Sequence, residues 1–403
     1  MTEEYRENKG PLKDLRVIEL GVLLAGPFCG QLLGDFGAEV IKVEQPGVGD
    51  PMREWGQTKL AGRSLWWPIA ARNKKSITLN LRTPEGQEII KQLVKDADIL
   101  LENFRPGTME KWGLGYDVLS EINPKLIMVR VSGYGQTGPY SYKAGYASVG
   151  EAMGGLRYVM GYPDRAPSRA GISIGDTLAA TFACLGTMMA LHHRDKTGRG
   201  QVVDSAIYEA VFAMMEGLIP EYQVSGYIRE RTGAILPKVA PSNIYETSDG
   251  MVIIGANQDT VFGRLAKAVG HGEWSEDPRY SSHNARGENQ EELDNKISEW
   301  TKQRTSNDVL AVMDENGVPS GKLFRAPEML EDPHFAAREA IVGVPYPEVG
   351  ELKMQNTFPK LSETPGSVRW AGPELGEHNQ EIYSGLLGLS DDKIKQLKDS
   401  GNI

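Results

Sequence analysis

The stretch that decides the fold is LRVIELGVLLAGPFCGQLLGDFGAEVIKVE, residues 15–44. It opens with a short apolar strand pattern at Leu15–Leu20 and closes with an alternating strand pattern at Ala38–Glu44. Between them, the loop Gly21–Pro27 leads into an apolar stretch at Phe28–Phe36 that indicates a helix. Strand, helix and strand within about thirty residues are typical of a right-handed βαβ unit, and they predict a parallel sheet.

The same alternation continues along the chain and predicts a doubly wound α/β domain. Further strands are expected at Ser76–Leu81, Ile99–Glu102, Leu126–Val131 and Val202–Asp204. Further helices are expected at Pro84–Lys95, Tyr116–Ile122, Thr177–Leu191 and Ile207–Val224. The loop Gly21–Pro27 does not match the glycine pattern GxGxxG, so we do not expect a nicotinamide or flavin site.

A second, smaller domain is expected at residues 225–330, which open with a loop rich in turn-forming and charged residues at Gly226–Ser242. Its segments read as a strand at Met251–Gly255 and as helices near Val261–Val269, Glu291–Lys302 and Ser306–Asn316. This mixture indicates an α+β unit. Residues 1–224 precede it, and residues 331–403 follow it with extended pieces and a last helix near Ser390–Ser400.

Charge and composition exclude several kinds of partner. The 403 residues carry 44 Lys and Arg against 54 Asp and Glu, a formal net charge of −10, which argues against a nucleic-acid partner. No window offers about 18 uninterrupted apolar residues, so no membrane span is expected. The six histidines are scattered without ligand spacing, so no metal site is expected. The only cysteines, Cys29 and Cys184, fit a cytoplasmic protein without disulfides.

One carboxylate, Asp176, stands between a glycine-rich turn and the long uncharged run Thr177–Leu191. The run predicts a buried helix with Asp176 in its first turn, where the positive end of the helix dipole favours a negative charge. One interpretation is an ordinary helix N-cap. The other is an ionised nucleophile at the mouth of a cleft. Spacing alone leaves both interpretations open.

Several cations lie near the predicted strands and could bind an anionic ligand. They are Arg72, Lys74, Lys75, Arg82, Arg105, Lys111 and Lys143. Ligands of doubly wound sheets bind at the carboxyl ends of the strands, where Arg82, Arg105 and Lys143 are expected. Their recurrence at matching strand ends favours a ligand rich in phosphate.

Six motifs stand out along the chain: LRVIELGVLLAGPFCGQLLGDFGAEVIKVEQPGVGDPMREWG, NKKSITLNLRTPEG, DILLENFRPGTMEKWGLGY, GYGQTGPY, GISIGDTLAA and KTGRGQVVDSAIYEAV. In this order, from about Leu12 to Pro373, the chain resembles the class III CoA-transferases, the family of formyl-CoA and carnitine CoA-transferases. The resemblance implies a Rossmann-like large domain built from residues 1–224 and 331–403, with the small α+β domain 225–330 inserted. It also implies a ring-shaped chain that forms an interlaced dimer, either a homodimer or a dimer with a related chain. No cofactor is expected to be tightly bound, because coenzyme A enters as a thioester substrate.

By this resemblance Asp176, in GISIGDTLAA, is the nucleophile that attacks the acyl-CoA thioester. The residues implied to contact CoA are Val22, Leu23, Ala25, Leu79, Leu81, Arg82, Asn103, Phe104, Arg105, Lys111 and Lys143. The residues expected to contact the transferred acid are Leu24, Trp66, Tyr146, Arg165, Arg169, Gly255 and Asn257. Leu24 and Trp66 stand where formyl-CoA transferase has a glutamine and a tyrosine, so an oxalate-sized pocket is not expected. The segment Gly255–Gln258 resembles the glycine-rich lid of that enzyme but has a single glycine.

Within this family, the sequence is most similar to the enzymes that use succinyl-CoA with another dicarboxylic acid, such as malate, citramalate, itaconate or benzylsuccinate. Arg165 and Arg169 could hold the second carboxylate of that acid by bidentate pairing. One alternative is a relative of α-methylacyl-CoA racemase, but the second acid/base that a racemase needs is missing from the loop Ala144–Ala147. The other alternative is a non-catalytic CoA-binding partner subunit, which would be expected to have lost Asp176.

Overall fold

The computed structural model describes residues 8–403, which divide into two compact units. The first unit comprises the chain up to Leu156 together with Ala170–Gly217 and His334–Ile403. The second comprises Arg157–Arg169 and Leu218–Pro333. Arg157–Arg169 lies within residues 1–224, which were expected to form part of the large domain, but this segment belongs to the second unit. The Gly233 N–H donates to the carbonyl of Gly161 at 2.9 Å, which ties this segment to the chain beyond residue 218.

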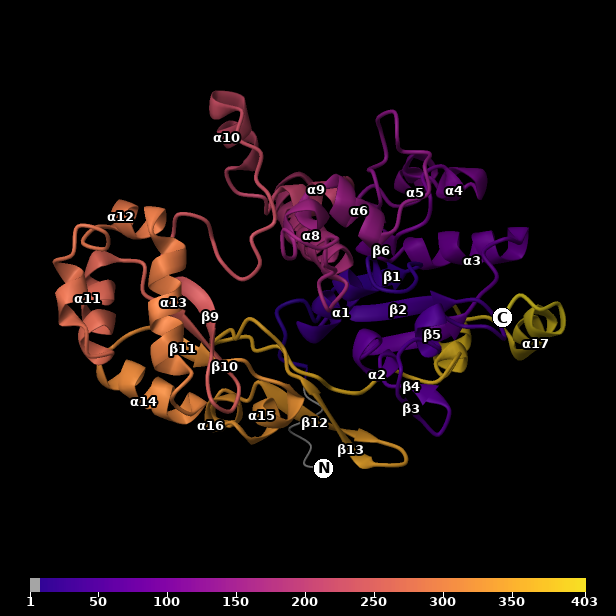
Figure 1. Ribbon diagram of the computed structural model, residues 1–403. Coiled ribbons are helices and arrows are strands. Elements are labelled where there is room, and N and C mark those ends of the chain that lie inside the picture. Colours follow the sequence, from indigo (N-terminus) through magenta and orange to yellow (C-terminus); the bar gives the residue numbers. More distant parts are fainter. Residues whose placement is uncertain (1–7) are drawn as a thin grey trace. The chain divides into compact units, whose positions relative to one another are not determined.

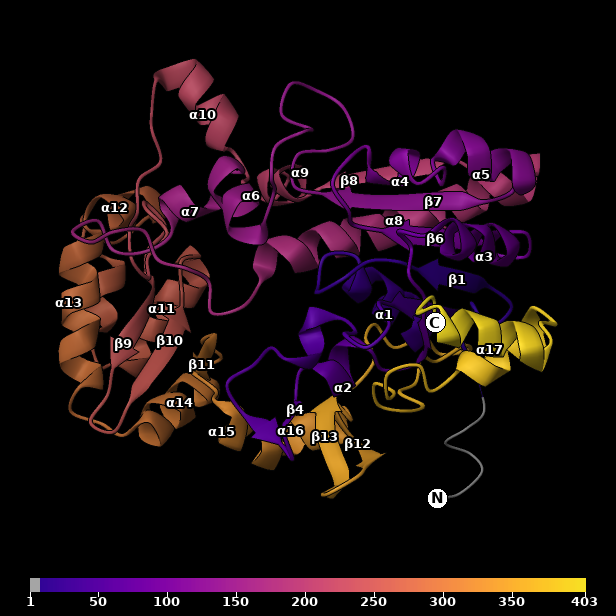
Figure 2. The same ribbon diagram turned by 90° about the vertical axis from the view of Figure 1, so that its right-hand side faces the viewer.

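A six-stranded parallel sheet forms the centre of the first unit (Figures 1 and 2). Its strands are β1 (Arg16–Glu19), β2 (Glu39–Glu44), β5 (Lys74–Thr78), β6 (Ile99–Glu102), β7 (Ile127–Ser132) and β8 (Val202–Ala206). Their spatial order is β5-β2-β1-β6-β7-β8, and every neighbouring pair is parallel. This is the strand order of a Rossmann sheet, so the predicted α/β class with a parallel sheet is confirmed.

Helices cover both faces of this sheet because successive residues of a strand point to opposite sides. In β1, Ile18 belongs to one apolar core and Val17 to the other. The helices on the side of Ile18 are α3 (Pro84–Val94), α5 (Tyr116–Ile122) and α17 (Asp391–Asp399). The helices on the side of Val17 are α1 (Pro27–Asp35), α8 (Ile174–Thr197) and α9 (Ile207–Phe212).

Helix α8 lies along β7 and β8 (Figure 2). Ala179, Ala180 and Ala183 are buried against the sheet, and their small side chains allow a close approach. By length and composition alone α8 could cross a membrane, although its sequence has no run of about 18 uninterrupted apolar residues. It packs against α1, α9 and the two strands, while Leu185 and Met189 on it are exposed.

The C-terminal segment of the chain packs on the first unit. Tyr383 donates its hydroxyl to the carbonyl of Thr78 at 2.6 Å, and the N–H of Asn80 donates to the carbonyl of Asn402 at 2.8 Å. The remaining helices of this unit are α2 (Trp67–Ala70), α4 (Thr108–Lys111), α6 (Ala147–Met153), a 3-10 turn (Pro51–Arg53) and a π-helix (Glu381–Leu386). Its remaining strands are the pairs β3 (Lys59–Leu60) with β4 (Arg63–Ser64) and β12 (Ile341–Tyr346) with β13 (Gly350–Gln355).

The second unit is built on a three-stranded antiparallel sheet. Its strands are β9 (Ser242–Glu246), β10 (Met251–Gly255) and β11 (Ser320–Lys322). The helices that follow or flank them are α10 (Leu218–Ser225), α11 (Asp259–Ala268), α12 (His283–Glu288), α13 (Gln290–Thr301), α14 (Ser306–Glu315) and α15 (Ala326–Glu331). Two short helices, α7 (Leu156–Val159) and α16 (Pro333–Ala337), lie at the boundaries between the units. In β10, Val252 and Ile254 are buried while Met251 and Ile253 are exposed, as expected for a sheet covered on one face.

The prediction of one long helix over Ile207–Val224 is wrong. The structure has α9 and α10 there, separated by an irregular segment. Glu216 adopts a left-handed backbone conformation with φ of 51°, which a continuous α-helix does not allow. Pro220 has no N–H to donate and its ring clashes with a preceding helical turn, so it is accommodated only near the start of α10.

Candidate active site

The candidate site lies where the strand order of the parallel sheet reverses, between β1 and β6. Ligands of doubly wound sheets bind beyond the carboxyl ends of the strands at such a point. The loops that follow β1 and β6 are bonded to each other there. Asn103 accepts a hydrogen bond from the N–H of Val22 at 2.8 Å and donates its amide to the carbonyl of Val22 at 2.9 Å.

A cavity of about 260 Å³ opens on one side of these loops, and we call it the aromatic cavity. Its lining includes Val22, Leu79, Leu81, Arg82, Phe104 and Trp112. The rings of Phe104 and Trp112 meet edge to face, with centroids 5.2 Å apart. Flat apolar walls beside one guanidinium suit an aromatic ring that carries phosphate. The structure therefore brings five residues implied to bind CoA to one cavity.

A second cavity of about 160 Å³, which we call the Asp176 cavity, shares Val22 with the first. Its lining includes Val22, Leu23, Leu24, Ala25, Asn103, Tyr146 and Asp176. These are seven of the residues singled out from the sequence. Among the described residues that line it, Asp176 is the only carboxylate and none is a histidine.

Asp176 is the third residue of α8 and not its N-cap, so the N-cap interpretation is wrong. The N-cap position belongs to Ser173, whose side chain makes no capping hydrogen bond. The N–H of Gly175 donates instead to Glu151, a buried carboxylate of α6, at 3.3 Å. Asp176 thus lies in the first turn of α8 as predicted, at the helix end whose partial positive charge favours an ionised carboxylate.

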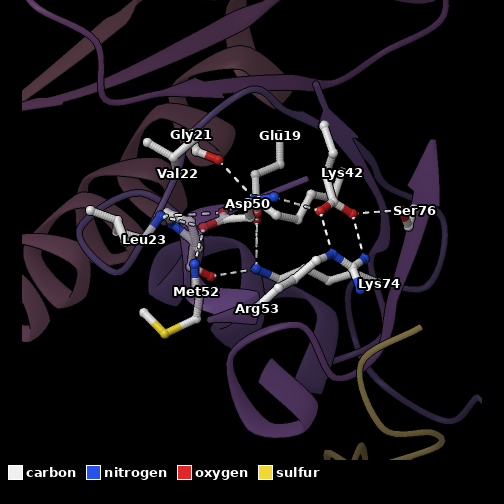
Figure 3. Close-up of polar contacts among 12 residues, drawn as sticks. Glu19, Gly21, Val22, Leu23, Lys42, Asp50, Met52, Arg53, Lys74 and Ser76 are labelled. Atoms are coloured by element: carbon white, nitrogen blue, oxygen red, sulfur yellow. Dashed lines mark hydrogen bonds and ion pairs between the residues drawn. The ribbon is translucent and has the colours of Figure 1, made fainter. Parts of the chain in front are cut away.

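The loop after β1 is fastened by buried charged side chains (Figure 3). Lys42 of β2 donates to the carbonyl of Gly21 at 2.8 Å and pairs with Asp50 at 2.8 Å and with Glu19 at 3.1 Å. Asp50 accepts the N–H of Leu23 at 3.1 Å. Leu23 has a φ of 64°, in the left-handed region that is unfavourable for a side chain with a Cβ.

Two of the cations expected to hold an anionic ligand are instead buried in ion pairs. Lys74 is fully buried, lies 2.8 Å from Glu19 and donates to the carbonyl of Pro27 at 2.7 Å. Arg72 pairs with Asp35 at 2.6 Å. The sequence contained a signal for the buried roles, because Glu19 and Lys42 interrupt apolar strands that a doubly wound sheet buries on both faces.

Five other predicted residues of the first unit lie outside the lining of both cavities, and one of them, Lys75, pairs with Glu39 and Glu381 at 2.6 Å each. Arg105, Lys111 and Lys143 are exposed, and the Lys143 ammonium lies 3.6 Å from the centre of the Tyr140 ring. Trp66 is 45% exposed and packs edge to face on Trp55, with centroids 6.4 Å apart. Trp55 itself lines the Asp176 cavity.

The other four predicted acid-binding residues belong to the second unit. They are Arg165, Arg169, Gly255 and Asn257. The Arg165 guanidinium lies 5.7 Å from the centre of the Tyr162 ring. The loop that contains Gly255 and Asn257 is anchored, because the N–H of Gly255 donates to Pro319 at 2.9 Å and fully buried Arg286 donates to the carbonyl of Asn257 at 2.8 Å.

The described residues contain no group of three or more His, Cys, Asp or Glu side chains that could hold a metal ion. The chemistry available in the Asp176 cavity is that of a carboxylate at a helix terminus. A carboxylate in that position can act as a nucleophile toward an activated acyl group.

Comparison with known proteins identifies the family. The model of CoA-transferase family III matches residues 12–379. The chain is 62% identical over 389 residues to a succinyl-CoA–D-citramalate CoA-transferase of Chloroflexus aurantiacus, covering 96% of this chain and 97% of that one. It is 42% identical over 392 residues to the β subunit of a succinyl-CoA–L-malate CoA-transferase of the same organism, covering 96% and 97%. A crystal structure of a CAIB/BAIF family protein from Brucella suis matches with a TM-score of 0.84 at 35% identity, covering 94% of this chain and 100% of that one. The chain belongs to CoA-transferase family III.

Proposed function

We propose that this CoA-transferase moves CoA from succinyl-CoA to a substituted dicarboxylic acid, with citramalate and malate as the first candidates. The observation that carries the proposal is the placement of Asp176 in a cavity that shares Val22 with the aromatic cavity. One ligand can thus bind through its nucleotide end in one cavity and present its thioester in the other. The names of the two Chloroflexus relatives support succinyl-CoA as donor and a dicarboxylate as acceptor.

The two cavities suggest how the CoA thioester lies. Leu79, Leu81 and Phe104 form apolar walls for the adenine ring, and Arg82 faces its phosphates. Arg105, Lys111 and Lys143 are the exposed cations that we assign to the remaining phosphates. Val22, Leu23 and Ala25, with Asn103 behind them, guide the pantetheine arm toward Asp176. CoA is a substrate in this scheme, and no tightly bound cofactor takes part.

The reaction needs only Asp176 as a covalent group. Its carboxylate attacks the thioester carbonyl of succinyl-CoA, the C–S bond breaks, and CoA leaves as thiolate while a succinyl–aspartyl anhydride forms. The thiolate then attacks the aspartyl carbonyl, which releases succinate and leaves an aspartyl–CoA thioester. The acceptor carboxylate repeats the two steps in reverse order and leaves as its CoA thioester. Every intermediate is hydrolysable, so the narrow cavity has to exclude water.

The residues that we assign to the acceptor follow from the family resemblance. In the first unit these are Leu24, Trp66 and Tyr146. In the second unit we assign Gly255 and Asn257, together with Arg165 and Arg169, whose guanidinium groups suit the second carboxylate of a dicarboxylic acid. An unchanged KM for the acceptor in Arg169→Ala would remove that arginine from the scheme.

We also propose that the enzyme works as a dimer of ring-shaped, interlaced chains in the cytoplasm, with Cys29 and Cys184 as free thiols. The partner is a second copy or a related chain. An α and a β subunit are named for the L-malate transferase of Chloroflexus, which supports the related-chain form for that enzyme. Exposed Leu185 and Met189 on α8 provide apolar surface for such a partner. Light scattering of the purified chain distinguishes a homodimer from a monomer that dimerises only with a related chain.

The proposed activity is tested by incubating the protein with succinyl-CoA and a panel of acids that includes citramalate, malate, itaconate and glutarate. Mass spectrometry should detect new CoA esters whose formation matches the release of succinate. The outcome against the proposal is an absence of transfer to any acid together with deuterium exchange at an acyl α-carbon. That outcome would favour the racemase, although a racemase needs a second acid/base that the described lining of the Asp176 cavity does not provide.

A further inference from the structure

The loop Gly21–Pro27 is fastened at five points by four side chains, none of which takes part in the covalent steps. Two fastenings are the hydrogen bonds of Asn103 to Val22. Two are ammonium groups, since Lys42 holds the carbonyl of Gly21 and Lys74 holds the carbonyl of Pro27. The fifth is Asp50, which accepts the N–H of Leu23 (Figure 3). Four of the seven loop residues are buried, so their backbone groups need partners within the protein.

The contact of Asp50 with Leu23 differs from the other four because it fixes a strained residue. With φ at 64°, Leu23 carries a side chain in a backbone conformation that glycine adopts readily and leucine does not. Such a conformation persists only where the surroundings determine it. Both Leu23 and its neighbour Leu24 line the Asp176 cavity, so the shape of that cavity depends on this conformation.

Asp50 can hold Leu23 because its own position is fixed on every side. Its carboxylate also accepts the N–H of Met52 at 2.8 Å, and its backbone N–H donates to Glu44 at 2.9 Å. Only 2% of the residue is exposed, and a buried carboxylate needs a cation close by. Lys42 supplies that cation at 2.8 Å. Burial would raise the pKa of Asp50, but Lys42 and the N–H groups of Met52 and Leu23 together hold the pKa below its ordinary value.

We propose that Asp50, paired with Lys42, is a positioning residue that fixes the loop Val22–Ala25 in the shape that binds the CoA thioester. The identity of the ligand as a CoA thioester rests on the proposed function, whereas the effect of Asp50 on the loop does not. Asp50 acts through the backbone of Leu23 and contributes no group to the reaction. Its loss should therefore loosen the loop and weaken CoA binding beyond any general loss of stability.

The test compares Asp50→Asn with Asp35→Asn. Asp35 is 3% exposed and pairs with Arg72 at 2.6 Å, so its variant also breaks a buried ion pair, but its partners Arg72 and Asn73 lie outside the loop. Amide hydrogen exchange of a peptide covering residues 20–28 should become at least about tenfold faster in Asp50→Asn and stay unchanged in Asp35→Asn. This readout needs no ligand, so it judges the inference even if the protein fails to transfer CoA.

Calorimetry with free CoA gives the second readout. The Kd for CoA should rise about tenfold in Asp50→Asn, which corresponds to about 1.4 kcal/mol, and less than about twofold in Asp35→Asn. Unchanged loop exchange in Asp50→Asn, or equal weakening of CoA binding in both variants, would overturn the proposal. If Asp50→Asn does not fold, Asp50→Glu keeps the charge but displaces the carboxylate, and faster loop exchange is expected there as well. Loop exchange of Asp50→Glu equal to that of the parent protein contradicts the positioning role.

A third variant separates positioning from direct contact with CoA, because Asp50 also lines the aromatic cavity. Leu23→Gly removes the strain, since glycine accepts a positive φ. In that background Asp50→Asn should change the Kd for CoA by less than about twofold. A full tenfold effect in both backgrounds would mean that Asp50 contacts the ligand itself, and the positioning role would be wrong.

Discussion

The loops after β1 and β6 meet at the switch point, and each is held by a buried carboxylate that accepts a backbone N–H group. In the loop after β1, Asp50 accepts the N–H of Leu23 at 3.1 Å. In the loop after β6, Glu102 accepts the N–H of Phe104 at 2.7 Å. Asp50 lies 27 residues from Leu23 in the sequence, whereas Glu102 lies two residues before Phe104. They differ in the cation behind the carboxylate.

Lys42 is almost fully buried, and burial would lower its pKa, but the carboxylates of Asp50 and Glu19 raise it above its ordinary value. Arg130 instead divides its guanidinium between Glu102 and the half-exposed Glu110, each at 2.7 Å. Burial therefore raises the pKa of Glu102 above its ordinary value, and Arg130 only partly offsets this. The loop that lines the Asp176 cavity is held by a firmly charged pair, whereas the loop that carries Phe104 is held by a carboxylate that takes up a proton more readily.

The largest expected effect is a fall in kcat without a change in CoA binding, which distinguishes the chemical step from the two binding loops. Asp176→Asn should lower kcat at least about 10⁴-fold, because the covalent route is lost, while the Kd for CoA stays within about twofold since both loops remain intact. Steady-state kinetics and calorimetry measure the two quantities. Asp176→Ala serves as the control against slow deamidation of the asparagine. Residual turnover above 1% of the parent rate in Asp176→Ala would remove Asp176 as nucleophile.

The next largest effect is on the free energy of unfolding, when the cation that pairs with each carboxylate is removed. Lys42→Met leaves Asp50 and Glu19 without their shared ammonium, and it should lower the free energy of unfolding by about 3–5 kcal/mol. Arg130→Met should cost only about 1–3 kcal/mol, because Glu102 can take up a proton once its partner is gone. Denaturant titrations of both variants at neutral pH give the two values. Equal costs would mean that the difference between the two loops is not electrostatic.

Truncation of the aromatic wall gives a smaller effect that is confined to binding. Phe104→Ala removes the ring that meets Trp112 at 5.2 Å, and the KM for succinyl-CoA should rise about tenfold with little change in kcat. The change affects the loop after β6 and not the Asp176 cavity. A fall in kcat without a rise in KM would contradict the assignment of the aromatic cavity to the nucleotide end of CoA.

The smallest effect is a difference in how the two carboxylates respond to pH. Asp50 has a folded-state pKa below its ordinary 3.8, so it adds stability above pH 3.8 that is lost as the pH falls through the lower value. Glu102 has a folded-state pKa above its ordinary 4.5, so its contribution to stability declines as the pH rises from 4.5 through the higher value. Asp50→Asn should flatten the acid limb of the stability profile. Glu102→Gln should remove the decline at higher pH, and identical profiles for both variants would contradict the comparison.

The parallel sheet and the placement of Asp176 could be predicted because both depend on local pattern. Buried parallel strands read as apolar runs, and the long run of uncharged residues after Asp176 predicts a helix with Asp176 in its first turn. The break between α9 and α10 could not be predicted in this way, because the apolar pattern continues through it. The left-handed Glu216 and the position of Pro220 decide that break.

The sequence pattern hints that some charges are buried, but it could not predict how these charges pair, for a different reason. Lys42 and Lys74 find their common partner, Glu19, 23 and 55 residues away in the sequence, and only the strand order brings the three together. The sequence of one strand alone does not show whether a lysine lies in solvent at the edge of the sheet or is buried in an ion pair. The same limit applies to Arg72, whose partner Asp35 lies 37 residues away.

In the proposed reaction Asp176 carries first the acyl group and then CoA. The direct measurement is rapid quenching of the enzyme with succinyl-CoA, followed by mass spectrometry of the peptide that contains Asp176. We predict a CoA or succinyl adduct on that residue, which hydroxylamine converts to the hydroxamate. Transfer of CoA at the full rate without any adduct on the Asp176 peptide would show that Asp176 is not the covalent carrier.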